Sequence, residues 1–296
     1  MCYVLEGDHL VYGVCQAIEG EKDPHCLMLI FRIVKVLAEM FPDPTGPVAN
    51  VAEEIFDNLG RYFPIHYTHM AFASTPFFEP FAIPLLLEKL DSSLPLAKVD
   101  SLKYLSCCAT MYGPKLLGKH AEAIWASLKC AILYSAGQPV LPSTFDWTDS
   151  MSFQENEIMK EAFSLLQIVT SQPDYAFLDL IIQDAEIHNT VNQIQDFGNY
   201  DDITPQNKHK LLVVGRVLSI LAKASLASCN KVFEICLGRL LDTLGVSQTS
   251  SVVDPVMVDV SSTVFNFGAL YLSIQIIAAS RDLALASTEL ASCFNL

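Results

Sequence analysis

The stretch that most resembles a catalytic motif is GPKLLGKH, residues 113–120. Its glycine and lysine spacing nearly matches the phosphate-binding loop G-x-x-x-x-G-K-[ST], whose backbone N–H groups and lysine hold nucleotide phosphates. His120 replaces the hydroxyl that would bind Mg²⁺, Pro114 lies inside the loop, and the preceding residues have the apolar spacing of a helix rather than a strand. We therefore expect a helix-turn-helix here and no nucleotide site.

A second candidate is the HYTH stretch, where His66 and His69 stand three residues apart. This spacing can bind a metal ion. Because no cysteine or carboxylate stands nearby in the sequence to complete a site, we expect a turn with two exposed histidines and no metal.

Nine cysteines are present, without any C-x-x-C pair, and most of them lie in apolar runs: Cys2, Cys15, Cys26, Cys107, Cys108, Cys130, Cys229, Cys236 and Cys293. An odd number of scattered cysteines in apolar surroundings is typical of buried free thiols in a reducing compartment. This indicates the cytoplasm or the nucleus. It favours packing over ligation of an iron–sulfur cluster, including for the adjacent pair Cys107 and Cys108 and for Cys229 and Cys236.

Other catalytic signatures are missing from the sequence. There is no G-x-S-x-G and no H-E-x-x-H, and acid pairs such as Glu155 and Glu157 stand two apart, so they diverge on a helix. The sequence predicts that the chain is not an enzyme and holds no cofactor.

The composition requires a large apolar core. Hydrophobic residues make up 51% of the 296 residues and charged residues only 17%. The longest apolar run, 265–279, contains Asn266, Ser273 and Gln275, and falls short of the roughly 18–20 apolar residues that a membrane span needs. Since the N-terminal residues show no secretory signal either, we expect a soluble chain that buries its apolar surface between helices.

Helical spacing of apolar residues recurs along almost the whole chain, as in Leu96, Val99, Leu102 and Leu105. Turn signals divide the chain into successive helix pairs, and prolines stand at or just before helix starts, where the missing N–H costs nothing. The expected helices cover residues 8–18, 24–41, 47–62, 76–90, 96–112, 114–134, 153–170, 173–188, 206–227, 230–244, 257–279 and a last fragment, 283–294.

First helices of successive pairs begin about 38–40 residues apart where loops are short, a period typical of HEAT or armadillo repeats. The predicted fold class is all-α, a HEAT/armadillo-type α-solenoid of about six helix pairs. It forms a single domain over residues 1–296, with polar loops at about 135–152, 189–205 and 245–256. The pair that starts at Pro47 lacks a full second helix, so it is truncated near 60–76, which we expect to be the weakest part of the stack.

The net charge of −15 is concentrated in one stretch. Between Tyr134 and Pro205 there are twelve acidic residues and a single base, Lys160. Such a stretch repels nucleic acid and can attract a basic segment of a partner protein; the alternative is a solvated face with polar loops. The candidate partner-binding residues are Asp146, Asp149, Glu155, Glu157, Asp184, Glu186, Asp196, Asp201 and Asp202.

Four ordered phrases resemble one protein family. They are GEKDPHCLMLIFRIVKVLAEMFP (20–42), YFPIHYTH (62–69), ASTPFFEPFAIPLLLEKLDSSLPLAKVDSLKYLSCCATMYG (73–113) and HAEAIWASLK (120–129). They are similar to the MMS-nineteen family, in a plant-like form. The resemblance is strongest over residues 10–135.

The resemblance implies a HEAT-repeat scaffold of the cytosolic iron–sulfur assembly pathway, linked to nucleotide excision repair. Such a scaffold brings client apoproteins of DNA repair, replication and transcription to the targeting complex. The implied partners are the targeting subunits, client helicases and polymerases, and components of transcription factor IIH, without direct nucleic acid or membrane contact. The implied location is the cytoplasm and the nucleus.

Family members are about three times longer, so the chain is expected to be part of the N-terminal half, starting and ending within the solenoid. The family also has a longer segment where HYTHMAFAS stands here. The alternative function is a generic HEAT-repeat adaptor or karyopherin-like transport receptor, whose acidic surface would suit basic targeting peptides.

Overall fold

The computed structural model describes residues 2–62, 71–134, 157–172, 176–246 and 266–286. Within these ranges every regular element is helical and none is a strand, which confirms the all-α prediction. None of the described helices is long and apolar enough to cross a membrane. The chain falls into two compact units, one formed by residues 1–131 and 156–174 and the other by residues 132–155 and 175–296.

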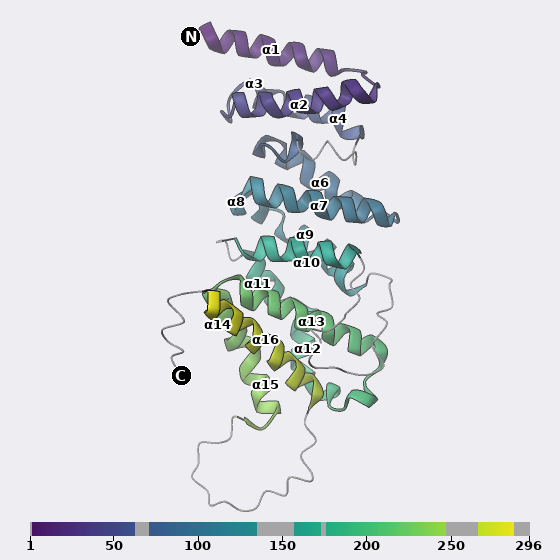
Figure 1. Ribbon diagram of the computed structural model, residues 1–296, viewed down its shortest axis with the longest axis vertical. Helices are drawn as coiled ribbons and strands as arrows, with labels where there is room; N and C mark the ends of the chain where they lie inside the picture. The colour runs from purple at the N-terminus through teal and green to yellow at the C-terminus, as the bar shows by residue number, and fades with distance from the viewer. Residues whose placement is uncertain (1, 63–70, 135–156, 173–175, 247–265, 287–296) are drawn as a thin grey trace, which may run out of the picture. The chain divides into compact units, whose positions relative to one another are not determined.

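The first unit is a succession of helices that follow one another in chain order (Figure 1). Its elements are α1 (Cys2–Ile18), α2 (Pro24–Met40), α3 (Pro47–Asn50), α4 (Ala52–Leu59), η1 (Gly60–Tyr62), η2 (Pro76–Phe78), α6 (Glu79–Leu90), α7 (Pro95–Tyr112), α8 (Pro114–Gly118), α9 (Ala121–Leu133) and α10 (Glu157–Thr170). Helix α1 packs on α3 and α4, α6 packs on α7, and α7 packs on α10. The expected pairing of residues 76–90 with 96–112 is therefore confirmed.

Proline and capping residues explain where these helices begin. Pro24, Pro47, Pro95 and Pro114 each occupy the first turn of a helix, where a missing N–H breaks no internal bond. Asp23 caps α2: its carboxylate accepts hydrogen bonds from the backbone N–H groups of His25 and Cys26, at 2.8 and 3.1 Å. These bonds lower the pKa of Asp23.

Four aromatic rings cluster beside the stretch 60–76, which was expected to be truncated and weakest and of which residues 63–70 lie outside the described residues. The ring of Phe72 lies 4.9 Å from that of Phe56, 5.1 Å from that of Phe78 and 6.3 Å from that of Phe31, between ring centres. All four side chains are buried; three come from α2, α4 and η2, and Phe72 comes from the helical residues 71–72 just before η2. The four rings therefore join α2, α4 and the residues around η2 in one aromatic cluster.

The second unit contains the helices α11 (Ala176–Ile182), α12 (Ala185–Asn192), η3 (Ile194–Phe197), η4 (Tyr200–Asp202), α13 (Pro205–Ala224), α14 (Leu226–Val232), the π-turn η5 (Phe233–Leu237), α15 (Gly238–Thr243) and α16 (Phe267–Ala286). Helices α13 and α16 lie side by side (Figure 1). A Cβ atom on Gly215 of α13 would lie 2.6 Å from Cε1 of Tyr271, so the glycine is what lets the two helices approach so closely. Tyr271 is almost fully buried at this contact.

Several helix boundaries differ from the sequence-based expectation. The helix expected at 47–62 breaks at Val51, the one at 114–134 breaks after Gly118, and the one at 173–188 is interrupted before α12. The stretch 189–205, expected as a polar loop, instead forms the end of α12 and the turns η3 and η4. Its side chains Val191, Ile194, Phe197 and Ile203 are buried. The expectation was wrong here because it followed the polar composition of the stretch, whereas the three-residue spacing of Val191, Ile194 and Phe197 places these side chains on one side of short helical turns.

Candidate functional site

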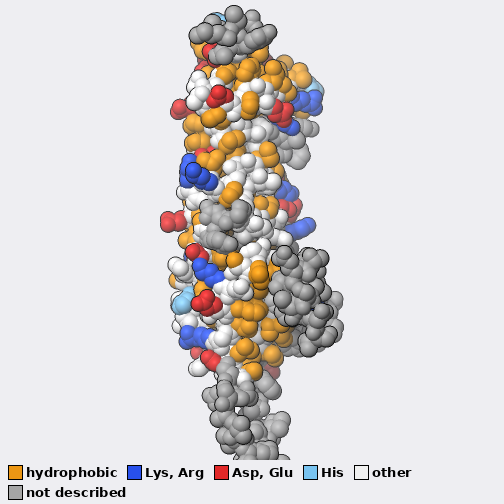
Figure 2. All heavy atoms as spheres, turned by 90° about the vertical axis from the view of Figure 1, so that its left-hand side faces the viewer, with side chains coloured by type: hydrophobic (Ala, Val, Ile, Leu, Met, Phe, Trp, Pro, Cys, Tyr) orange, Lys and Arg blue, Asp and Glu red, His pale blue; other side chains and the backbone are white. Residues whose placement is uncertain are grey.

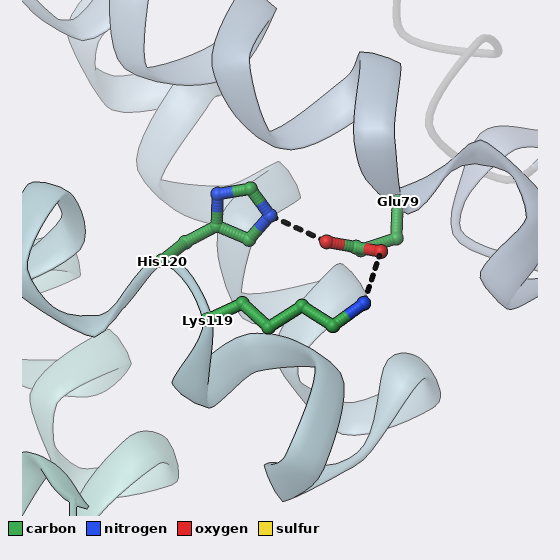
Figure 3. A network of polar contacts seen from close by, with 3 residues as sticks. All are labelled: Glu79, Lys119 and His120. Carbon is green, nitrogen blue, oxygen red and sulfur yellow. Dashed lines mark hydrogen bonds and ion pairs between the residues drawn. The ribbon is translucent and has the colours of Figure 1, made fainter.

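The residues of the apparent phosphate-binding loop belong to a helix-turn-helix. Gly113 ends α7 with a φ of +78°, a left-handed conformation that a glycine adopts without strain. Residues 114–118 then form α8 rather than an open loop. Lys119 and His120, in the turn before α9, both point toward Glu79 at the start of α6 (Figure 3). Their side chains thus serve a contact between helices, and the helix-turn-helix prediction is confirmed.

Glu79 lies at the centre of this contact. We call the three residues Glu79, Lys119 and His120 the Glu79 network. The Glu79 side chain is only 5% exposed. Nε2 of His120 shares a hydrogen bond with Oε1 of Glu79, and Nζ of Lys119 lies 3.7 Å from Oε2. A buried carboxylate requires such partners, because an unpaired charge away from water is strongly destabilising. The arrangement joins residues 41 positions apart in the chain.

Tyr112 and Cys108 pack at the end of α7, close to this network. The hydroxyl of Tyr112 donates a hydrogen bond to the carbonyl oxygen of Phe72, at 2.7 Å. Burial raises the pKa of Tyr112 well above its usual range, and the neighbouring Cys108 side chain and the Glu79 carboxylate raise it further. Burial also raises the pKa of the Cys108 thiol to about 12, which keeps it protonated and unreactive. The two side chains thus contribute buried packing and one hydrogen bond to this part of the first unit.

The candidate acidic residues are spread over several environments. Asp146, Asp149 and Glu155 lie outside the described residues. Glu157, at the start of α10 in the first unit, forms an ion pair with Lys103 of α7, 3.4 Å between Oε1 and Nζ.

The remaining candidates lie in the second unit. Asp184 caps α12 by accepting a hydrogen bond from the N–H of Glu186, at 2.9 Å. Glu186 in turn forms an ion pair with Lys210, 2.6 Å between Oε2 and Nζ. Asp202 accepts a hydrogen bond from the side-chain amide of Asn199, at 3.0 Å. Asp196, Asp201 and Asp202 are exposed.

The face drawn in Figure 2 shows acidic side chains dispersed among basic and apolar ones, within each unit, rather than gathered into one patch. The structure brings together Asp184 and Glu186, which are close in sequence and serve local contacts. Asp196, Asp201 and Asp202 are exposed, whereas Asp184 and Glu186 are half-buried.

The described cysteines differ in burial. Cys15, Cys108, Cys229 and Cys236 are buried free thiols, as expected, whereas Cys26, Cys107 and Cys130 are exposed. His66 and His69 lie outside the described residues. Among the described residues, no three side chains of the metal-binding types come together.

Sequence reasoning missed a cavity at the start of α2. Its volume is about 380 Å³, and its lining is mainly apolar: Lys22, Pro24, His25, Leu27, Met28, Phe31 and Tyr62. Tyr62 also donates a hydrogen bond to the carbonyl oxygen of Glu21, at 2.5 Å, which ties the end of η1 to the turn before α2. No single motif signals this cavity, because its walls come from two segments about 40 residues apart.

Comparison with known proteins decides the family. The N-terminal family model of MMS19, described as Dos2-interacting transcription regulator of RNA-Pol-II, matches residues 3–134. The MMS19 nucleotide excision repair protein homolog of Arabidopsis thaliana is 43% identical over 303 aligned residues, covering 96% of this chain. The chain belongs to the MMS19 family.

Animal MMS19 proteins match over shorter regions. The human and Xenopus laevis homologs are 31% and 30% identical, each over 62% of this chain. The chain spans about a quarter of the Arabidopsis MMS19 protein, 26%, and smaller shares of the human and Xenopus proteins, 18% and 19%. The region that the family model matches, residues 3–134, contains nearly all of α1 and the helices from α2 to α9, and with them the Glu79 network.

Proposed function

We propose that this chain is a non-catalytic scaffold of the cytosolic iron–sulfur targeting pathway that helps deliver clusters to apoproteins of DNA repair, replication and transcription. The observation that carries the proposal is the MMS19 family membership over 96% of the chain. The relatives named nucleotide excision repair proteins connect the family with DNA repair. The proposed locations are the cytoplasm and the nucleus.

The architecture that we propose for this role is one continuous HEAT-type α-solenoid. Support comes from the helix packing within each unit, where α7 packs on α6 and α10 in the first unit and α13 packs on α14 and α16 in the second. Stacked pairs bury a core between neighbours and leave long surfaces for protein partners. That arrangement agrees with the way in which the Glu79 network is used, which is to join helices rather than to do chemistry.

The proposed contact surface is the exposed acidic group of Asp196, Asp201 and Asp202, together with the rest of the acidic stretch. Partners with basic segments would be attracted to it, and nucleic acid would be repelled. The proposed partners are the targeting subunits, client helicases and polymerases, and transcription factor IIH components.

The test is affinity capture of the tagged chain from plant cells, followed by quantitative mass spectrometry. Enrichment of iron–sulfur targeting subunits and client helicases supports the scaffold. Enrichment of a Ran-type GTPase and importin cargo instead would favour a karyopherin-like receptor. Stoichiometric iron or zinc in the purified chain would contradict a scaffold that carries no metal.

The acidic surface is tested with a matched pair of triple variants. The first changes Asp196, Asp201 and Asp202 to asparagine, and the control changes three exposed acids of the first unit, Glu53, Asp57 and Glu122, to the corresponding amides. Both remove three negative charges, so the net charge is the same. Loss of the captured partners in the first variant only is expected; equal recovery in both would rule out this surface.

A further inference from the structure

The solvent-facing side of α2 carries an unbroken apolar stripe, the α2 stripe, formed by Leu29, Ile33, Val36 and Met40. These side chains are 56%, 43%, 49% and 59% exposed. Their spacing of four, three and four residues places them in one row along the helix. The opposite side of α2 is buried in the first unit through Leu27, Phe31, Val34, Leu37 and Ala38. Helix α2 is therefore apolar on two sides, and only one of them is covered.

Exposed large apolar residues on other helices of the first unit stand apart from one another along the helix, as Leu96 and Met111 do on α7. The exposed row of α10 consists of Glu157, Lys160, Ser164 and Gln167. The exposed row of α7 contains Lys103, Cys107 and Thr110. Single exposed apolar residues are ordinary on a protein surface, whereas a contiguous row indicates an interaction site. The α2 stripe therefore differs from its neighbours in a way that predicts a helical partner.

We propose that the α2 stripe pairs with the α2 stripe of a second copy of this chain, with the two helices antiparallel across a twofold axis. The row has the 3.5-residue repeat of a coiled-coil seam. In an antiparallel pair centred between Ile33 and Val36, Ile33 packs on the partner's Val36 and Leu29 packs on the partner's Met40. The twofold axis repeats both contacts, so the four exposed side chains of each copy are all covered.

Charge complementarity favours this occupant over a different protein. Arg32 and Glu39 are both exposed, and both stand one position before a seam residue, on the same side of the stripe. At these flanking positions, an antiparallel pair places Arg32 opposite the partner's Glu39, and the axis generates the reciprocal pair. Within one copy, Glu39 has only a 3.8 Å ion pair with Lys35, between two exposed side chains. Its carboxylate remains accessible to a second cation.

The expected association is reversible and weak. One helix pair covers less area than the roughly 800 Å² per partner of a standard stable interface, so we expect a dissociation constant in the micromolar range. The net charge of −15 on each copy adds long-range repulsion, which also favours a weak dimer.

The first experiment is sedimentation velocity of the full 296-residue chain over a concentration series that spans the micromolar range. We expect a concentration-dependent monomer–dimer equilibrium. Ile33→Glu should abolish the dimer, because it places a charge in the middle of the seam. Ser164→Glu, at an exposed position of the polar row of α10, is the matched control and should leave the equilibrium unchanged. A chain that stays monomeric throughout, or a dimer that survives Ile33→Glu, overturns the proposal.

Charge reversal provides a second test that does not depend on the seam. Arg32→Glu and Glu39→Arg should each weaken self-association about tenfold, since each replaces two attractive contacts by two repulsive ones. Mixed in equal amounts, the two variants should form heterodimers, because every cross-pair is then complementary. Circular dichroism of each variant checks that the helices are intact. Failure of the mixture to associate better than either variant alone would exclude the antiparallel arrangement, since a parallel pair does not bring these positions together.

Discussion

The Glu79 network provides the sharpest test of how the first unit is held together. His120 supplies the hydrogen bond to the buried Glu79 carboxylate, whereas Lys119 approaches only to 3.7 Å and is itself 59% exposed. His120→Ala leaves a buried negative charge with only this long, solvent-screened ion pair. The expected loss in the free energy of unfolding is about 2–3 kcal/mol, the cost of leaving a buried charged acceptor unsatisfied.

Lys119→Ala is the control at the same site. An ion pair that involves an exposed lysine contributes roughly 0–1 kcal/mol, so its removal should lower the free energy of unfolding by less than about 1 kcal/mol. Glu79→Met replaces the charge by an apolar side chain of similar volume, and His120→Ala in that background should cost much less than in the wild type. The double-mutant cycle separates the contact from the loss of imidazole packing.

Urea unfolding followed by tryptophan fluorescence measures these differences. The chain has two tryptophans, and Trp125 is buried in α9, five residues after His120. In a Trp147→Phe background, the signal therefore reports on the first unit, which matters because a chain with two units need not unfold in one step. Equal losses for Lys119→Ala and His120→Ala, or additive losses in the cycle, would refute the reasoning.

Three further predictions concern packing, capping and thiol reactivity. Gly215→Ala should lower the free energy of unfolding by about 1–3 kcal/mol, because the new Cβ forces the buried ring of Tyr271 aside. Gly13→Ala should raise it by about 0.5–1 kcal/mol, because a Cβ there meets nothing within 4 Å. Thermal unfolding shows whether each variant is less or more stable than the wild type. The pKa of Asp23 is lower in the folded chain than in the unfolded chain. The stability that its ionised form contributes is therefore fully present above the pKa of the unfolded chain and is lost as the pH falls through the lowered, folded-state pKa. The difference in melting temperature between wild type and Asp23→Ala should disappear on acidification, and a difference that does not depend on pH would contradict this. Iodoacetamide at pH 8 should label Cys130 in the native chain but Cys108 only after unfolding, as peptide mass spectrometry would detect; rapid native labelling of Cys108 would show that its site opens.

Much of the fold could be predicted because its signals are local. Pro24 and Pro114 start helices, and the stripe of Val99, Leu102 and Leu105 forms the buried face of α7. The breaks within helices were missed because tertiary contacts set them. The turn after Gly118, for example, places two side chains against Glu79, a residue about 40 positions earlier, and nothing in the local sequence reports this contact.

For the candidate acidic surface, the sequence predicted the excess of acidic residues but not which of their side chains are exposed. The excess of acids is plain in the sequence, but Asp184 serves as a helix cap and Glu186 pairs with Lys210, which a count of charges does not reveal. The α2 stripe was overlooked for a related reason. Leu29, Ile33 and Val36 fit the apolar pattern of a core helix, and only the structure shows which of the two apolar sides is already covered.

The two long-range tyrosine hydrogen bonds have a consequence for residues 63–70. Tyr62, just before that segment, is fastened to Glu21, and Phe72, just after it, is fastened to Tyr112. Each flank thus has its own anchor and does not rely on the peptide bonds between them. The residues on either side are therefore each tied by a tyrosine hydroxyl to a segment about 40 positions away, and neither tie crosses from one side to the other.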